Sequence, residues 1–401
     1  MKRFLHGIAA AICAAVLLSS CGGTDPERPE ARRVLLMYAA AFSNLSNSIS
    51  EDIDEICESG VPAAGSSDVL LIYAHTTRDR TQTKDLNAPV MFRVYRDTGG
   101  NVVRDTLFRY PETDDSATTE VFKKVLGDAV NHFPAKHYGM IFSSHGRGWV
   151  PPGYSESTSI WSVGPEGEQK EYPLTKEMGI EYGGKSGMDI REVAGAMPVK
   201  FDFIIMDACL MGCVEVAWEL RDKCRLLAFS PTEILTNGFY YKDMAPLLLN
   251  TPTPDVERVC REYFEQYDRM SGLYRSATVT LIDCSKMDAL ARACADIFSA
   301  HRDALDGFDP MSVQPYFYNN LHWFYDLRDL AVKLGASAHE LQVLDDALGA
   351  CIVYYACTEK FFDLELKDVC GLSSYIPLYG KNKLNNYYKT LSWNAATGLI
   401  Q

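Results

Sequence analysis

The segment YGMIFSSHGRGW, residues 138–149, decides the fold because an apolar strand stops abruptly there at a histidine and a glycine. A second segment, FDFIIMDACLMG (201–212), has the same form and stops at Asp-Ala-Cys. Continuous apolar runs of this length are typical of strands buried on both faces of a parallel sheet. Ligands bind at the carboxyl ends of such strands in open α/β sheets. We therefore predict that His145 and Cys209 meet at one edge of a sheet.

Apolar runs and amphipathic segments alternate on both sides of these two strands. Residues 33–40 and 68–75 are predicted to be buried strands, and residues 89–110 a β-hairpin turning at 98–100. A helical pattern at 119–133 precedes the histidine strand, and another begins just after Cys209. Strand–helix–strand alternation predicts a three-layer α/β/α sandwich with a mostly parallel central sheet.

The second half of the chain is more helical. We expect a catalytic α/β domain over residues 33–285 and a C-terminal helical region over 286–401 that packs on it. Within that region the pattern predicts a helix reaching to about Cys357, followed by a late strand near 370–379.

The first residues have the features of an export signal. Residues 1–20 combine a basic start with an apolar stretch that is too short to span a membrane. The following Leu-Ser-Ser-Cys resembles a bacterial lipobox, which implies cleavage before Cys21 and a lipid on its sulfur. Residues 21–32 suit a flexible tether. We expect a lipoprotein anchored in the cell envelope, at the periplasmic side or the cell surface; the alternative is an ordinary signal peptide with an incidental cysteine.

Composition narrows the partners and cofactors. The net charge is −14, and no basic segment suggests a nucleic-acid partner. The cysteines show neither CxxC pairs nor zinc-finger spacing, and no HExxH or G-x-S-x-G motif occurs. We expect a monomer that uses no metal and no cofactor. Disulfides are possible in an exported chain, but the sequence does not assign their pairing.

A thiol beside an imidazole is the minimum for a cysteine nucleophile. The helix after Cys209 would lower the pKa of its thiol through the helix dipole. Gly146 and Gly212 permit tight turns, and the backbone N–H groups of Gly146 and Cys209 could form an oxyanion hole. Each residue alone has a plainer interpretation as an inert core cysteine or a capping histidine, and His75 ends its strand in the same way.

The blocks SSHG and DAC, each after an apolar strand, resemble the clostripain-like cysteine peptidases, of the clan that holds caspases, legumain and gingipains. Weaker similarities extend from residue 33 to the C-terminus. The resemblance implies a caspase-like fold and a cysteine endopeptidase in which His145 is the general base and Cys209 forms an acyl-enzyme with protein or peptide substrates. The alternative is a catalytically inactive caspase-like lipoprotein that acts as a binding module.

Substrate preference is predicted from Asp207, because residues i and i+2 of a strand share a face and Asp207 should therefore point toward the site. The resemblance implies that this carboxylate selects Arg or Lys before the cut; a purely structural Asp is the alternative. Thr232 stands where the family commonly has an acidic residue, and Glu233 is the candidate to replace it. The family's Pro-Gly is absent from this loop, and Phe239 stands where the family tends to have Trp. Together with Thr232, these departures put strict Arg specificity in doubt.

The loop over residues 150–187 lies between the two catalytic strands in the sequence and carries Lys170, Lys176 and Lys185. The resemblance implies that such a loop is cut by the enzyme itself, which would make the full-length chain a zymogen. A solvated insertion that is never cut is the alternative.

Overall fold

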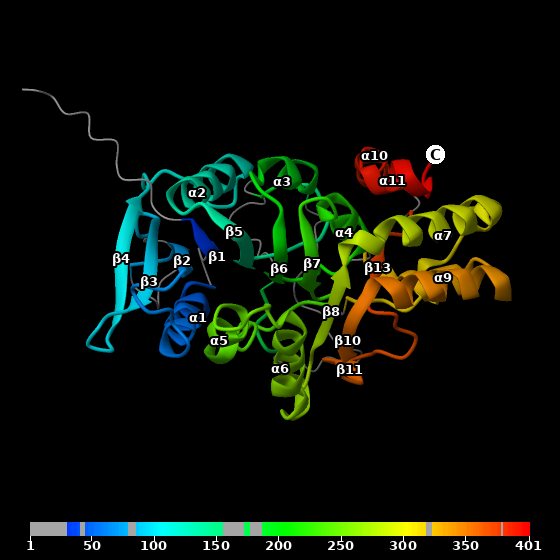
Figure 1. Cartoon of the computed structure of the whole chain (residues 1–401). Coiled ribbons are helices and arrows are strands. Elements are labelled where there is room, and N and C mark those ends of the chain that lie inside the picture. Colours follow the sequence, from blue (N-terminus) through cyan, green and yellow to red (C-terminus); the bar gives the residue numbers. More distant parts are fainter. Residues whose placement is uncertain are drawn as a thin grey trace, which may run out of the picture.

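The computed structural model describes residues 30–40, 45–78, 86–154, 172–176, 187–317, 323–377 and 380–401. Nine strands of this part of the chain form one sheet in the order β10-β8-β7-β6-β5-β1-β2-β3-β4 (Figure 1). Their bounds are β1 Ala31–Ala40, β2 Asp68–His75, β3 Val90–Arg96, β4 Val102–Arg109, β5 Ala135–Ser143, β6 Phe201–Asp207, β7 Cys224–Phe229, β8 Thr278–Asp283 and β10 Ile352–Cys357.

The centre of the sheet is parallel and its two edges are antiparallel. Strands β2, β1, β5, β6 and β7 run parallel to one another. The β3–β4 hairpin extends one edge and strands β8 and β10 extend the other, all with antiparallel pairing. The predicted α/β/α sandwich is therefore confirmed, with a mixed sheet whose parallel part includes the strands that precede His145 and Cys209.

Helices cover both faces of the sheet (Figure 1). One face carries α2 (Thr119–His132), α3 (Ile190–Ala196) and α4 (Val214–Leu220). The opposite face carries α1 (Ser46–Glu58), α5 (Met244–Leu248) and α6 (Val256–Asp268). The central strands are buried almost throughout, as their continuous apolar sequences predict.

The C-terminal region is helical and also completes the sheet. Its helices are α7 (Met287–Ala300), α8 (Leu327–Lys333), α9 (Ala338–Cys351), α10 (Asn382–Tyr388) and α11 (Ser392–Thr397). Two short ladders join β9 (Tyr325–Asp326) to β13 (Ser373–Ser374), and β11 (Lys360–Phe361) to β12 (Leu364–Glu365). The 3₁₀ turns are η3 Tyr241–Asp243, η4 Gly272–Tyr274, η5 Cys284–Lys286, η6 Arg302–Leu305 and η7 Pro310–Ser312.

The prediction of a helix to about Cys357 is wrong, because α9 ends at Cys351 and β10 follows at once. The sequence of β10 is Ile-Val-Tyr-Tyr-Ala-Cys, and β-branched and aromatic residues favour a strand wherever a partner edge is available. Strand β8 offers that edge. The late strand near 370–379 is reduced to the two residues of β13.

The predicted signal segment, Cys21 and most of the tether lie outside the described residues, as do Lys170 and Lys185. No helix in the described part of the chain is long and apolar enough to cross a membrane.

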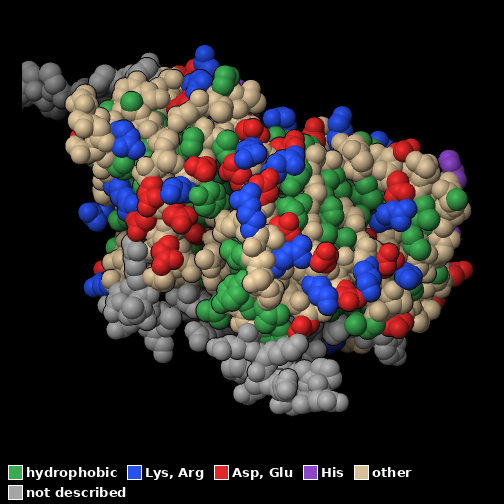
Figure 2. All heavy atoms as spheres, turned by 90° about the horizontal axis from the view of Figure 1, so that it is seen from below, with side chains coloured by type: hydrophobic (Ala, Val, Ile, Leu, Met, Phe, Trp, Pro, Cys, Tyr) green, Lys and Arg blue, Asp and Glu red, His purple; other side chains and the backbone are tan. Residues whose placement is uncertain are grey.

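Acidic and basic side chains are interspersed on the face shown in Figure 2. Every cysteine in the described ranges has a free thiol, and the sulfurs of Cys224 and Cys284 lie 3.5 Å apart.

Candidate active site

The register of β5 and β6 brings together the ends of the strands that precede His145 and Cys209. Ser143 pairs with Asp207 at the last position of the ladder. His145 and Cys209 each follow two residues later, so both leave the sheet at the same edge. The Ser144 amide still donates a hydrogen bond to the Asp207 carbonyl, at 3.4 Å. The predicted proximity of the two loops is therefore a direct result of strand pairing.

Glycine allows the backbones of these loops to touch. A Cβ on Gly146 would lie 2.4 Å from the carbonyl oxygen of Cys209, so no side chain fits there. A Cβ on Gly212 would lie 2.4 Å from the nitrogen of Pro231. Leu210, directly after Cys209, has a φ of 61°, which is strained for a residue with a side chain. The hydrogen bond from the Leu210 amide to the Thr232 carbonyl, at 2.9 Å, holds this turn.

A short segment from the long loop, residues 174–176, lies beside these turns. The amide of Lys176 donates to the carbonyl of Ile234 at 2.7 Å, and the amide of Thr236 donates to the carbonyl of Leu174 at 3.0 Å. The segment thus pairs in antiparallel fashion with residues 234–236, through a bridge between Thr175 and Leu235. Extended peptides commonly bind to proteins in this way, by adding a strand.

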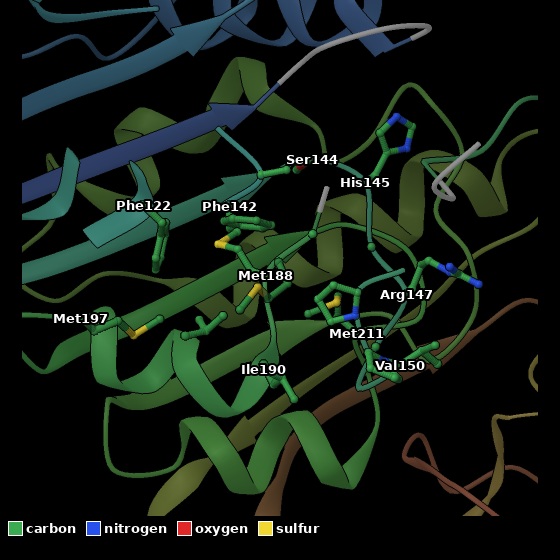
Figure 3. A pocket seen from close by; sticks show the side chains of 18 of the residues that line it. Phe122, Phe142, Ser144, His145, Arg147, Val150, Met188, Ile190, Met197 and Met211 are labelled. Carbon is green, nitrogen blue, oxygen red and sulfur yellow. The ribbon is translucent and has the colours of Figure 1, made fainter. Parts of the chain in front are cut away.

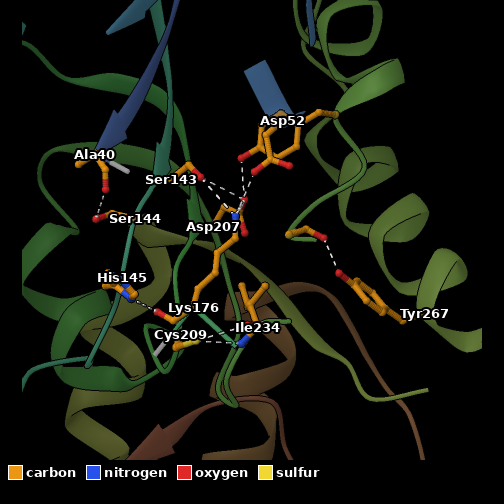
Figure 4. A network of polar contacts seen from close by, with 12 residues as sticks. Ala40, Asp52, Ser143, Ser144, His145, Lys176, Asp207, Cys209, Ile234 and Tyr267 are labelled. Carbon is orange, nitrogen blue, oxygen red and sulfur yellow. Dashed lines mark hydrogen bonds and ion pairs between the residues drawn. The ribbon is translucent and has the colours of Figure 1, made fainter. Parts of the chain in front are cut away.

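The Lys176 peptide group lies between the two catalytic candidates (Figure 4). Its carbonyl oxygen accepts a hydrogen bond from the Gly146 amide at 3.3 Å and lies 3.1 Å from Nδ1 of His145. The Cys209 sulfur accepts a hydrogen bond at 3.1 Å from the amide of Ile234, the residue that pairs with Lys176. His145 is half-buried and Cys209 is buried.

The Lys176 side chain is fully buried in a pocket of acceptors (Figure 4). Its ammonium lies 2.5 Å from Asp207 Oδ2, 3.2 Å from Asp52 Oδ2 and 3.3 Å from Ser143 Oγ. Tyr241 donates its hydroxyl to the same Asp207 oxygen at 2.6 Å. Burial lowers the pKa of the Lys176 ammonium, but the two carboxylates outweigh burial and hold that pKa above its ordinary value.

Asp52, on α1, is a pocket residue that sequence reasoning missed. Burial and the nearby Asp207 raise the pKa of the Asp52 carboxyl well above its ordinary value, although Lys176 opposes the shift. A signal was present in the sequence, because Asp52 is three residues after Ile49 and four before Ile56, on the buried stripe of an amphipathic helix. A carboxylate on such a stripe needs a buried partner.

Thr232 and Glu233 are buried beside the site but are not among the described partners of the Lys176 ammonium. The Thr232 hydroxyl lies 2.8 Å from that of Thr278, and the Thr232 carbonyl supports Leu210. Phe239 stacks on Tyr263 with ring centroids 4.4 Å apart.

Cys213 lies at the N-cap of α4, the helix that follows the cysteine loop. Burial raises the pKa of its thiol well above the ordinary value, because burial disfavours the thiolate. Two residues later, the buried carboxylate of Glu215 accepts hydrogen bonds from the amide of Tyr375 and the hydroxyl of Tyr388. The C-terminal region is thereby fastened to the helix that follows the cysteine loop.

The other face of β5 and β6 is apolar. A cavity of about 120 Å³ lies there under α2 and α3, lined by methionine and phenylalanine side chains that include Met140, Phe142 and Met206. Figure 3 shows His145 at its margin, with the ring directed away from the cavity. Within the described ranges, no group of three or more His, Cys, Asp or Glu side chains could hold a metal ion.

Comparisons with known proteins identify the family. The sequence profile of the clostripain family, Peptidase_C11, matches residues 37–342, more than half of the chain. An inactive zymogen C11 protease from Parabacteroides distasonis has a similar structure, with 26% identity, a TM-score of 0.74, and coverage of 92% of this chain and 99% of that chain.

A second similar fold is that of a secreted C11 cysteine protease from Bacteroides thetaiotaomicron in complex with an irreversible peptide inhibitor, with 24% identity and a TM-score of 0.70. That likeness covers 92% of this chain and 100% of the other. No curated protein sequence gives a match. The family profile and the zymogen structure lead to one conclusion: the chain belongs to the clostripain family and is a cysteine-type peptidase.

Proposed function

We propose that this peptidase cleaves peptide bonds after Lys or Arg with Cys209 as nucleophile and His145 as general base. His145 takes the thiol proton, and the thiolate adds to the carbonyl carbon of the scissile bond. The amides of Gly146 and Cys209 donate to the resulting oxyanion. His145 then gives its proton to the leaving amine, and water hydrolyses the acyl-enzyme.

The arrangement of Lys176 carries this proposal. Its side chain contacts Asp207, its carbonyl oxygen accepts from the Gly146 amide, and that oxygen lies beside His145. A substrate residue just before the cut would need all three contacts. Lys176 and its neighbours also pair with residues 234–236 as an extended peptide would. An internal segment in the position of a substrate supports both the dyad and the preference for a basic residue.

The same contacts support self-cleavage on the carboxyl side of Lys176. In the full-length chain, Lys176 fills the pocket, so an external peptide cannot place its own basic side chain there. Cutting after Lys176 would free the new chain end to leave. The similar chain from Parabacteroides distasonis is described as an inactive zymogen, which fits a family member that must be activated.

Intact masses test self-cleavage most directly. The wild type should yield two fragments, of which one ends at Lys176 and the other begins at residue 177. Cys209→Ala and Lys176→Ala should each remain uncut at the bond after residue 176. A wild-type chain that stays whole and hydrolyses peptides would remove the self-cleavage proposal.

A peptide ending in Lys with a thiol-reactive group tests the dyad. It should label Cys209 in the activated wild type, and labelling should be lost in His145→Ala, which cannot activate the thiol. Labelling of another cysteine, or hydrolysis of a Lys peptide by Cys209→Ala, would overturn the assignment. No hydrolysis and no labelling in the cut wild type would favour the inactive binding module.

We also propose that Cys21 carries a lipid that anchors a monomeric enzyme to the cell envelope, with the catalytic domain over 33–285 and the helical region over 286–401. The lipobox-like sequence before Cys21 supports the anchor. Cys21→Ala should move the protein from the membrane fraction to the soluble fraction. An unchanged distribution would reject the lipid anchor.

A further inference from the structure

The pocket around the Lys176 ammonium has as many acceptors as that group has donors. An ammonium carries three N–H donors and a guanidinium carries five in a planar fork. Asp207, Asp52 and Ser143 each offer an oxygen at 2.5–3.3 Å from the Lys176 nitrogen. The described pocket therefore has an acceptor for each N–H donor of a lysine ammonium. The additional N–H donors of an arginine guanidinium would need further acceptors.

The far end of the pocket is closed by backbone. Gly238 has a φ of 60°, and a Cβ on it would lie 2.6 Å from the Lys176 nitrogen and 2.5 Å from Asp207 Oδ2. The Gly238 carbonyl accepts from the Tyr267 hydroxyl at 2.8 Å, and its amide donates to the Leu235 carbonyl at 2.8 Å. A longer side chain would have to displace this fixed turn.

One observation favours arginine. Asp207 Oδ1 is buried and has no hydrogen-bond partner among the described residues, and a guanidinium fork could reach both oxygens of one carboxylate. However, a Cβ on Gly238 would lie only 3.0 Å from this oxygen, so the Gly238 turn runs close to it and limits the room for a planar fork. The closed end of the pocket therefore outweighs the unpaired oxygen.

Asp52 is what distinguishes this pocket from one built on Asp207 alone. It reaches the pocket from α1, its side chain is almost fully buried, and it binds the Lys176 ammonium on a different side from the catalytic strands. A second carboxylate at a fixed point suits a compact point charge better than a planar, delocalised one.

We propose that Asp52 is a specificity-determining residue that, with Gly238, makes this enzyme prefer Lys over Arg at the residue before the cut. This inference rests on the proposed cleavage after basic residues. It narrows the proposed preference from Lys or Arg to Lys. It also assigns the discrimination between these two side chains to a residue outside β5 and β6.

Two fluorogenic peptides that differ only in Lys or Arg before the cut test this preference on the activated enzyme. The wild type should have a kcat/KM at least tenfold higher for the Lys peptide. Asp52→Asn should lower kcat/KM for the Lys peptide at least tenfold and for the Arg peptide much less. Asp54→Asn is the matched control, because Asp54 is a half-buried residue of the same helix that pairs with Arg104, and it should leave the ratio unchanged.

An internal version of the test does not depend on added peptides. Lys176→Arg should slow self-cleavage at position 176 at least tenfold relative to the wild type, as measured by intact mass over time. This variant changes no pocket residue, so it remains informative if Asp52→Asn fails to fold.

The outcomes distinguish a failure of the Lys preference from a failure of the proposed function. Equal cleavage after Lys and Arg, a preference for Arg, or an unchanged ratio in a folded Asp52→Asn would overturn the Lys preference and leave the cysteine peptidase intact. If the folded and processed wild type cleaves neither the Lys peptide nor the Arg peptide, the proposed function is overturned, and the Lys preference with it.

Discussion

Two histidines stand at the same edge of the sheet, His75 at the end of β2 and His145 just beyond β5. Strand β1 lies between them and pairs with both, with Ala40 opposite His75 and Ala39 opposite Ser143. Their sequence contexts are alike, since each follows a continuous apolar strand. Their surroundings differ completely.

His75 lies in the core. It is 2% exposed, its Nδ1 lies 2.6 Å from the Ser116 hydroxyl, and the same hydroxyl lies 2.6 Å from that of Tyr73. Burial lowers the pKa of His75 to about 4, so its ring is neutral at pH 7. His145 is half-buried and faces a peptide carbonyl. A strand end thus becomes a catalytic candidate only where the next loop leaves room for a peptide.

The largest expected effect separates the two histidines by activity. His145→Ala and Cys209→Ala should each lower kcat/KM for a Lys peptide by at least about 10³-fold, because a nucleophile and its base act as a unit. His75→Gln and Cys213→Ala should keep most of the activity of the folded protein, as assayed by peptide hydrolysis. Comparable losses in His75→Gln, with its fold retained, would erase the distinction.

The next effect concerns the pocket of the Lys176 ammonium, whose backbone carbonyl lies beside His145. Asp207→Asn should lower kcat/KM for basic peptides by about 10- to 150-fold, since a charge-assisted hydrogen bond contributes about 1.5–3 kcal/mol. Profiling a peptide library against the variant and the wild type checks this. A wild-type preference for acidic or small residues before the cut would reject the pocket assignment.

His75 should instead appear in the pH dependence of stability. Its pKa is about 4 in the folded chain against 6.5 when exposed, so the unfolded chain binds the proton more readily. Stability should fall as the pH drops from 6.5 toward 4, by about 3 kcal/mol for this shift. Urea unfolding at several pH values measures the loss, and His75→Gln should reduce it. An equal slope in that variant would contradict the assignment.

The smallest effect concerns the hydroxyl that binds His75. Ser116→Ala removes the hydroxyl shared by Tyr73 and His75 and should lower the free energy of unfolding by about 1–2 kcal/mol. The rate of peptide hydrolysis by the folded enzyme should not change, because the described side-chain contacts of Ser116 are to the core residues Tyr73 and His75. A fall in kcat without a loss of stability would show that the two strand ends are coupled.

Much of this fold could be predicted from local patterns. The central strands, the hairpin and most helices follow from apolar periodicity, and the two candidate loops follow from strands that end in His-Gly and Asp-Ala-Cys. Strand β10 could not be predicted in this way, because Ile352–Cys357 has no intrinsic partner and becomes a strand only when β8 presents an open edge. Thr232 and Glu233 were selected by position after β7, and position alone does not determine side-chain direction in a loop.

The sequence by itself determined that His145 and Cys209 lie at one edge of the sheet and that Asp207 shares a strand face with Cys209. Both follow from local rules: side chains alternate along a strand, and parallel strands end at a shared edge. Tertiary structure alone decided that Lys176, 31 residues from His145, lies in the pocket, and that Asp52 reaches it from α1, 124 residues away from Lys176 in sequence. The physical reason is that a buried ammonium requires several acceptors at once. Only the packing of α1 against the end of the sheet supplies the second carboxylate.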